Sequence, residues 1–288
     1  MANPPKSPSF DWEMFRYVPS LAGAIIAIIV FVIMTCLQVW QWTRTRNHLV
    51  IYVIIGTLSE IGGYGARIGS HFDNASWAPF IIQGTMLLVG PLFYAATIYM
   101  MLGRTIILAQ GEDVSLIKPK WYTRVFVGAD ISTLVIQGLG ASIMGTKKLE
   151  LAIAGEKIVI AGLALQTATF VFFLVASVDF HIRMNRKASF ASNGSTGNPA
   201  DSIRMLWILY VISSLILVRC IFRLIEYSTG NAGYLISNEW TLYVFDAVPM
   251  FIVLVLLLVL QPTKYIPRKL SGFSEIEGGA SELRTQAA

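Results

Sequence analysis

"VPSLAGAIIAIIVFVIMTCLQVW", residues 18–40, decides the fold of this chain, because it is apolar over a length that crosses a membrane. A helix that rises about 1.5 Å per residue needs roughly 20 apolar residues to cross about 30 Å of hydrocarbon. Six further apolar blocks follow, at residues 49–69, 78–102, 121–144, 156–179, 205–228 and 239–261. They lack the two-residue alternation of a membrane β-strand. The sequence therefore predicts an all-α membrane protein, a bundle of seven transmembrane helices.

The composition of the chain supports the same fold class. Of its 288 residues, 55% are hydrophobic and 14% are charged, a balance far from that of a soluble domain. The two cysteines, Cys36 and Cys220, both fall inside predicted spans, so a disulfide framework is excluded. The net charge of +5 comes from basic loops beside the membrane, and it points to no nucleic-acid partner.

The distribution of basic residues predicts the orientation of the bundle. Of the 22 Lys and Arg residues, 14 lie in or near the connections after spans one, three and five and in the tail, 5 lie on the other side, and 3 lie within spans. By the positive-inside rule, the side with 14 faces the cytosol. We therefore expect an extracellular N-terminal segment at residues 1–17, a transmembrane domain at 18–262 and a disordered cytosolic tail at 263–288.

Ionisable residues lie inside the predicted spans, where they are costly and therefore point to function. In "SEIGGYGARIGSH", residues 59–71, Glu60, Tyr64 and Arg67 share one helical face. Polar residues of six spans fall at a similar depth, as expected for a water-accessible chamber open to the outside. The candidate ligand-binding residues are Glu60, Tyr64, Arg67, Gln83, Gln137, Arg219, Arg223, Glu226, Tyr243 and Asp246. Asp130 differs from them, because it lies on the cytosolic side.

A buried structural network is the alternative interpretation of these charges. It would neutralise three arginines with three carboxylates: Arg67, Arg219 and Arg223 with Glu60, Glu226 and Asp246. Such a network fixes the register of the helices without touching a ligand. Because two arginines one turn apart in the sixth span repel each other, anions must face both of them in either interpretation.

The glycines and prolines within the spans each have two interpretations. Glycines at positions 62, 63, 65 and 69 predict either close helix packing or a local loosening of the second span. Pro91 and Pro249 predict kinks in the third and seventh spans. A kink serves either the shape of the bundle or a gating hinge.

Several classes of seven-helix protein are excluded by missing residues. A retinal protein needs a lysine in the last span, and residues 239–261 contain none. A zinc hydrolase needs converging histidines, but His48, His71 and His181 fall on loops at opposite membrane faces. The chain has no P-loop for ATP, and it lacks the motifs and the disulfide of a G-protein-coupled receptor. We therefore predict a non-enzyme without a metal site or cofactor, with His71 as a weak candidate ligand for a haem or porphyrin iron.

Six motifs occur in order along the chain: "EIGGYGARI" (60–68), "QGTMLLVGPLFYAATIYM" (83–100), "DISTLVIQGLGA" (130–141), "AGLALQ" (161–166), "RCIFRLIEYSTGNAGYL" (219–235) and "EWTLYVFDAVPM" (239–250). With them the chain resembles the fungal lipid-translocating exporter family, seven-helix proteins named for resistance to aminocholesterol, over residues 17–262. The resemblance implies a fungal plasma-membrane protein that exports or flips sphingoid long-chain bases and gives resistance to toxic amphiphiles and stress. The resemblance also implies a link to protoporphyrin uptake, since another member of that family is associated with it. Besides the candidate ligand-binding residues, Pro91, Tyr94, Asp130 and Trp240 also match the motifs of this family.

The expected function is transport or translocation of amphiphilic lipids, with the head group bound in an outward-facing polar chamber. Its carboxylates suit the amine of a sphingoid base, whereas its arginines suit a phosphate or a porphyrin propionate. A lipid- or stress-responsive sensor that acts through cytosolic partners on the loop 181–204 and the tail is the alternative. Binding or transport of haem or porphyrin through His71 is a third possibility. The sequence leaves the oligomeric state open.

Overall fold

The computed structural model describes residues 20–72, 77–108, 119–144, 149–190, 199–229 and 239–259 of the chain. Six long helices are α1 (Leu21–Thr45), α2 (His48–Phe72), α3 (Trp77–Leu108), α4 (Pro119–Met144), α5 (Leu149–Phe190) and α6 (Pro199–Ser228). The seventh span is built from α8 (Glu239–Leu242), a π-helical turn η1 (Tyr243–Ala247) and α9 (Val248–Val259). Within these described ranges, seven helices are long and apolar enough to cross a membrane, as the sequence predicts.

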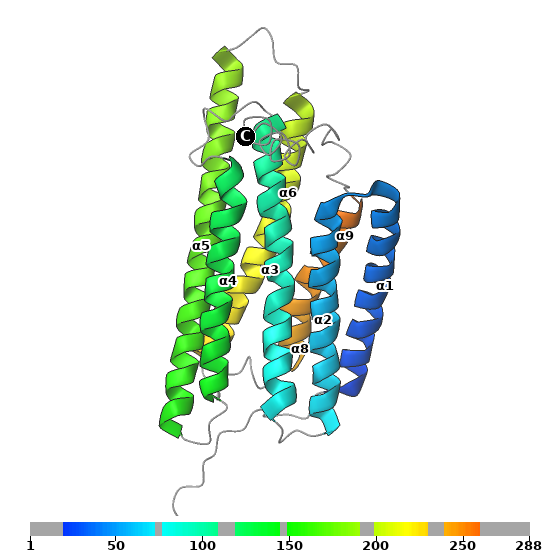
Figure 1. The fold of residues 1–288 in the computed structure, drawn as a ribbon, viewed down its shortest axis with the longest axis vertical. Coiled ribbons are helices and arrows are strands. Elements are labelled where there is room, and N and C mark those ends of the chain that lie inside the picture. The colour runs from blue at the N-terminus through cyan, green and yellow to red at the C-terminus, as the bar shows by residue number, and fades with distance from the viewer. Residues whose placement is uncertain are drawn as a thin grey trace, which may run out of the picture.

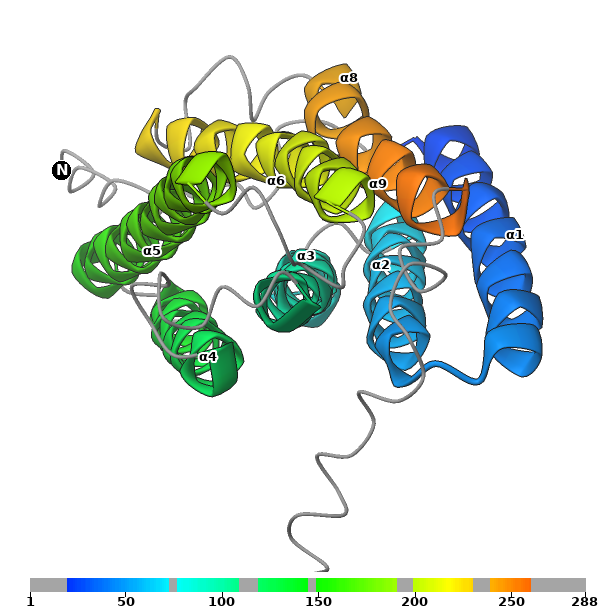
Figure 2. The same cartoon turned by 90° about the horizontal axis from the view of Figure 1, so that it is seen from above.

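The helices run up and down alternately in one bundle (Figures 1 and 2). We call the end at which α1 begins and α2 ends the lower end, as drawn in Figure 1. Helices α4 and α5 stand together at one side, α1 and α2 at the other, and α3 lies between these pairs. Helix α6 crosses the bundle obliquely and, with α9, covers one face of α3 and α2 (Figure 2). The centre of the bundle is therefore enclosed by α2, α3, α6 and the seventh span.

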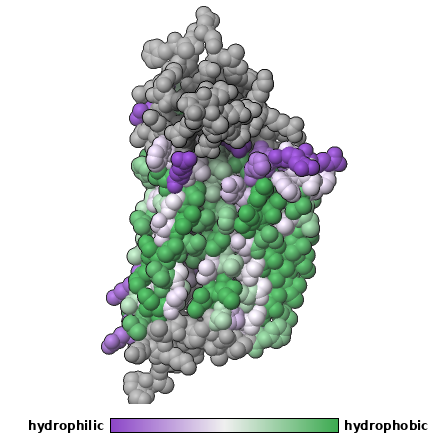
Figure 3. Space-filling model, in the orientation of Figure 1, coloured by the Kyte–Doolittle hydropathy of each residue, from purple (hydrophilic) through white to green (hydrophobic). Residues whose placement is uncertain are grey.

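The surface has the polarity of a membrane protein. Figure 3 shows apolar residues over the middle of the visible face and hydrophilic residues at its edges. Large apolar side chains on the outside of the helices, such as Ile33, Leu139 and Val175, are more than half exposed. An exposed apolar belt of this kind is what lipid tails cover. The described chain is therefore that of an integral multi-pass membrane protein.

Helix α5 is much longer than predicted. Its 42 residues replace the predicted span 156–179 and continue at both ends. The predicted loop 181–204 is wrong over most of its length, because α5 runs to Phe190 and α6 begins at Pro199. An ion pair of 2.8 Å between Arg183 Nε and Asp179 Oδ2, one turn apart, supports α5 beyond the apolar block. Residues 1–19 and 260–288, with the expected N-terminal segment and tail, lie outside the described residues.

Close packing of α2 against α3 depends on glycine. A Cβ added at Gly63 would lie 2.7 Å from the Leu87 side chain, and one at Gly90 would lie 2.6 Å from Glu60 Oε1. A Cβ at Gly65, by contrast, would meet nothing within 4 Å. The packing interpretation is therefore confirmed for Gly63, and it does not hold for every glycine of this helix.

Candidate functional site

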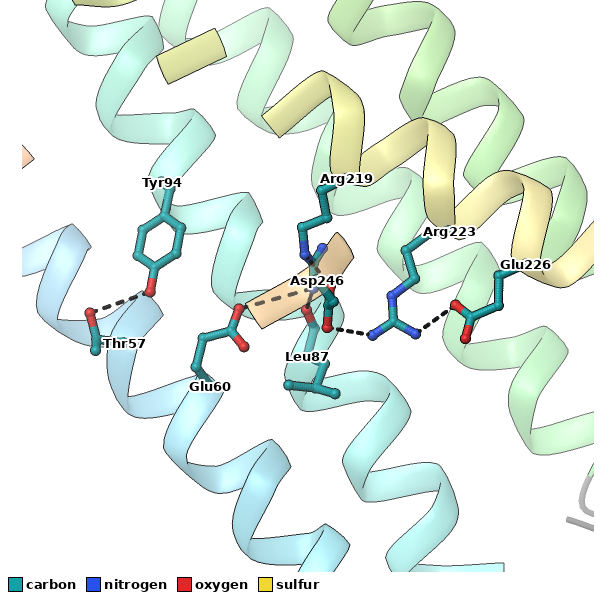
Figure 4. A network of polar contacts seen from close by, with 8 residues as sticks. All are labelled: Thr57, Glu60, Leu87, Tyr94, Arg219, Arg223, Glu226 and Asp246. Carbon is teal, nitrogen blue, oxygen red and sulfur yellow. Dashed lines mark hydrogen bonds and ion pairs between the residues drawn. The ribbon is translucent and has the colours of Figure 1, made fainter. Parts of the chain in front are cut away.

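Five charged side chains meet in the middle of the bundle (Figure 4). They come from α2 (Glu60), α6 (Arg219, Arg223 and Glu226) and η1 (Asp246), and all five residues are buried. Arg223 Nη2 lies 2.8 Å from Asp246 Oδ2, and Arg223 Nη1 lies 3.0 Å from Glu226 Oε2. Arg219 Nε pairs with the other oxygen of Asp246. We call these five residues the central network.

Asp246 is central to this network, because its two carboxylate oxygens form ion pairs with two different arginines, Arg219 and Arg223. It lies in η1, where the N–H of Val248 bonds to the carbonyl of Tyr243 five residues earlier. Pro249, directly after this turn, has no N–H for the carbonyl of Phe245. A π-turn inserts one extra residue into the helix and so rotates the side chains that follow it. The predicted kink at Pro249 is thus associated with a π-turn that carries Asp246.

Arg219 has a second partner that a proline makes available. Its Nη2 donates to the backbone carbonyl of Leu87 on α3. In a regular helix that carbonyl would accept from the N–H of residue 91, four positions later. Position 91 is Pro91, which has no N–H to donate. The proline therefore leaves an acceptor in the middle of the membrane, and Arg219 satisfies it.

Glu60 is the most weakly held carboxylate of the central network. Its Oε1 lies 4.0 Å from Arg219 Nη2, and no hydrogen-bond donor of the described residues reaches either of its oxygens. The side chain is fully buried and packs against Gly90. One turn below it, the hydroxyl of Tyr64 is also buried without a partner among the described residues. The ring of Tyr64 stacks between Phe31 and Tyr243, at centroid distances of 5.7 and 6.2 Å.

A second cluster lies nearer the lower end. Arg67 Nη2 is 2.8 Å from Glu239 Oε1, and the hydroxyl of Tyr243 donates to the same oxygen at 3.1 Å. The backbone N–H of Ser20 lies 2.9 Å from both oxygens of Glu239. The cluster therefore joins the start of α1 and the start of the seventh span to α2. The alternative interpretation, a buried network that neutralises Arg67 with Glu60, Glu226 or Asp246, is wrong for this arginine, because Glu239 pairs with it.

The two candidate glutamines lie apart from these ion pairs. Gln137 Nε2 on α4 donates to Gln166 Oε1 on α5 at 2.9 Å. Gln83 on α3 is 7% exposed, and its Oε1 has no hydrogen-bond partner among the described residues.

His71, the weak haem-ligand candidate, lies on the last turn of α2 and contacts the ring of Phe72 edge to face at 5.4 Å. Among the described residues, no three His, Cys, Asp or Glu side chains come together as metal ligands.

A cavity adjoins the central network between α3, α4, α5 and α6. Asp130, Gln166, Arg219 and Arg223 contribute its polar wall. The free space takes roughly one group of the size of a water molecule, which is too little for a lipid. On α3, beside this cavity, Tyr99 donates a hydrogen bond of 2.9 Å to Asp130 Oδ2. Sequence reasoning missed Tyr99, because a tyrosine inside an apolar block looks like an ordinary core residue.

The structure thus brings eight of the ten candidate ligand-binding residues into the two clusters or into contact with them. The predicted chamber open to the outside stays a prediction, because the charged side chains are buried in this structure. If the predicted chamber opens, the ion pairs that are buried in this structure must separate or change partners.

Comparison with known proteins gives a family and several relatives. The family described as "RTA1 like protein" matches residues 53–269. "Protein RTA1" of Saccharomyces cerevisiae is 31% identical over 87% of this chain and 85% of its own length. "Protoporphyrin uptake protein 1" of the same yeast is 29% identical over 84% of this chain and 89% of its own length. "Sphingoid long-chain base transporter RSB1", also from that yeast, is 27% identical over 85% and 72%. No solved structure matches the chain.

Proposed function

Because this chain belongs to the RTA1-like family of membrane proteins, we propose that it moves amphiphilic lipids with a basic head group across the plasma membrane. One relative is named as a sphingoid long-chain base transporter, and such a base carries an amine on an apolar chain. Another is named as a protoporphyrin uptake protein, whose cargo has acidic propionates. The substrate class must therefore be argued from the charges of this chain.

The balance of charge at the centre favours a cation. The central network and the adjoining cavity contain four carboxylates, those of Glu60, Asp130, Glu226 and Asp246, but only two guanidinium groups. Arg67 does not change this balance, because Glu239 pairs with it. An excess of buried carboxylate is stabilised by a cationic ligand and destabilised by an anionic one. The excess of acid at the centre is the single observation that carries the proposal.

The weak contact of Glu60 indicates where the head group binds. Its 4.0 Å separation from Arg219 is too long for a hydrogen bond, whereas Arg219 also holds Asp246 and the carbonyl of Leu87. An ammonium group can therefore replace Arg219 beside Glu60 while Arg219 keeps its two other partners. In this mechanism the arginine occupies the place of the substrate amine when no substrate is bound.

In this mechanism the amine reaches Glu60 from the lower end, and the cluster around Glu239 closes that route when no substrate is bound. Tyr64 lies between Glu60 and Arg67 on the same face of α2, and Tyr243 contacts both the Tyr64 ring and Glu239. Opening the bundle there requires the Arg67–Glu239 ion pair to separate. With the excess of basic residues on the opposite side of the chain, we assign the lower end to the outside and the tail to the cytosol.

The test is movement of a fluorescent long-chain base in liposomes that contain only the purified chain. We expect the wild type to move it, Glu60→Gln to lose most of this movement, and Ser59→Ala to behave as wild type. Ser59 is a suitable control because its hydroxyl bonds to the carbonyl of Ile55 on its own helix. If wild-type liposomes show no movement, the transporter proposal fails and a sensor that needs cytosolic partners is favoured.

A porphyrin cargo is the second candidate, favoured by the relative named for protoporphyrin uptake. Protoporphyrin itself contains no iron, so His71 at the lower end enters this candidate as an axial ligand only when the cargo is the iron form, haem. This candidate predicts a Soret band on addition of haem that disappears in His71→Ala. An unchanged band in His71→Ala removes that residue from the proposal.

A further inference from the structure

Asp130 is a buried carboxylate outside both ion-pair clusters. It lies on α4 and is 2% exposed. Its Oδ2 accepts the hydrogen bond from Tyr99, and its Oδ1 has no hydrogen-bond partner among the described residues. No Lys, Arg or His of the described chain forms an ion pair with it, in contrast to Asp246, Glu226 and Glu239.

A carboxylate in the middle of a membrane protein needs a cation or a proton. Removing it from water is costly, and one hydrogen bond from a tyrosine offsets only part of that cost. The two arginines nearest to it in the cavity wall, Arg219 and Arg223, are already held by Asp246 and Glu226. Asp130 is therefore left with one oxygen available for an additional positively charged group.

The cavity beside Asp130 has the size and the lining for such a group. It takes roughly one group of the size of a water molecule, which is also the size of an ammonium. Apart from Thr167 and Cys220, its remaining wall is apolar, and it includes Leu88, Leu163, Ile216 and the aromatic residue Phe170. An ammonium is attracted by an aromatic face as well as by a carboxylate. A small cation bonded to an apolar chain matches this lining better than a hydrated metal ion.

We propose that Asp130, oriented by Tyr99, is a second cation-binding subsite that takes the primary ammonium of a long-chain amine. The subsite is separate from Glu60, and Arg219 lies between them, since it contacts Glu60 and also lines the Asp130 cavity. An amine that leaves Glu60 can therefore bind next to Asp130, on the other side of Arg219. This inference rests on the proposed function, because it assigns a second binding site to the same substrate.

The test measures binding and movement of a long-chain amine separately. Hexadecylamine is titrated into the full-length chain in nanodiscs, with hexadecanol as the uncharged probe of equal length, and the fluorescent base is followed in liposomes. In a Glu60→Gln background, which removes the carboxylate of the first site, we expect Asp130→Asn to weaken hexadecylamine binding roughly tenfold or more, as for a lost bond between charged groups, and to leave the weak binding of hexadecanol unchanged. Ser132→Ala, on the same helix with its hydroxyl bonded to Gly128, is the control and should bind as wild type.

The results with these variants distinguish failure of the proposed function from failure of the Asp130 subsite alone. If the wild type neither binds nor moves the amine, the proposed function fails together with this subsite. If adding Asp130→Asn to Glu60→Gln leaves hexadecylamine binding unchanged, the subsite is wrong, and loss of movement in Asp130→Asn alone would then indicate a proton-carrying role. If Asp130→Asn does not fold, Asp130→Glu should retain binding and Tyr99→Phe should weaken it. Wild-type binding in Tyr99→Phe would contradict the orienting role of the tyrosine.

Discussion

The guanidinium of Arg219 on α6 donates to the backbone carbonyl of Leu87 on α3. The acceptor is available because Pro91 removes the N–H that would otherwise bond to it. A residue that breaks one helix thus provides the anchor for a charge on another. The same arginine contacts Glu60 and Asp246, so the break in α3 helps to set the geometry of the central network.

Pro91→Ala should therefore impair transport without lowering stability. The restored N–H competes with Arg219 for the carbonyl of Leu87, and Arg219 is free to move closer to Glu60. We expect slower movement of the long-chain base per folded molecule and an unfolding temperature equal to or above that of the wild type. Pro79→Ala is the control, since a proline in the first turn of a helix has no helical acceptor to leave unpaired. Equal transport by both variants would contradict the role assigned to Pro91.

Arg223→Gln should destabilise the fold strongly. It removes the partner of two buried carboxylates, Asp246 and Glu226, and loss of one member of a buried pair costs about 3–5 kcal/mol. Adding Glu226→Gln should recover part of this loss, because Glu226 has no other ion-pair partner among the described residues, whereas Asp246 keeps its ion pair with Arg219. Unfolding of the two single variants and the double variant in mild detergent gives the coupling free energy. Strictly additive effects would show that the two side chains do not interact.

Glu239→Gln should loosen the lower end of the bundle. The carboxylate accepts from Arg67, Tyr243 and the backbone of Ser20, and the charge strengthens each of these bonds. We expect a loss of about 1.5–3 kcal/mol in the free energy of unfolding, the usual range for hydrogen bonds to a charged group. Glu150→Gln, at an exposed position near the start of α5, should have no effect. Equal losses in the two variants would indicate a general effect of charge instead of this cluster.

Two glycines on α2 provide a matched pair. Gly63→Ala places a methyl group 2.7 Å from Leu87 and should destabilise the bundle by about 1–3 kcal/mol. Gly65→Ala adds the same methyl group where nothing lies within 4 Å, and it should be neutral or slightly stabilising. Thermal unfolding of the two variants side by side measures the difference. If Gly65→Ala is the more damaging of the two, the packing of α2 against α3 described above is wrong.

Much of the fold follows from the sequence, because the length of an apolar block is a local property. All seven spans are predicted in order, and the error at α5 arises where helix continues past the membrane core. Hydropathy predicts where a helix enters lipid, but not where it ends in water. The bounds of the other spans differ by a few residues for the same reason.

The partners of the intramembrane charges are only partly predictable. Arg223 and Glu226 are neighbours at i and i+3, so their contact follows from helical geometry. The pairing of Arg67 with Glu239 depends on how α2 is rotated against the seventh span, which no local pattern encodes. The position of Asp246 depends on one extra residue in a π-turn, and Pro249 was the available signal for it.

The measurement that tests the central claim most directly compares head groups in liposomes that contain only this chain. A fluorescent long-chain base with a free amine is compared with its N-acylated form and with a carboxylate of the same chain length. The excess of carboxylates around Arg219 and Arg223 predicts that the free amine moves fastest and that Glu60→Gln removes this preference. Equal movement of all three compounds, or a preference for the carboxylate, would contradict a cation-selective site.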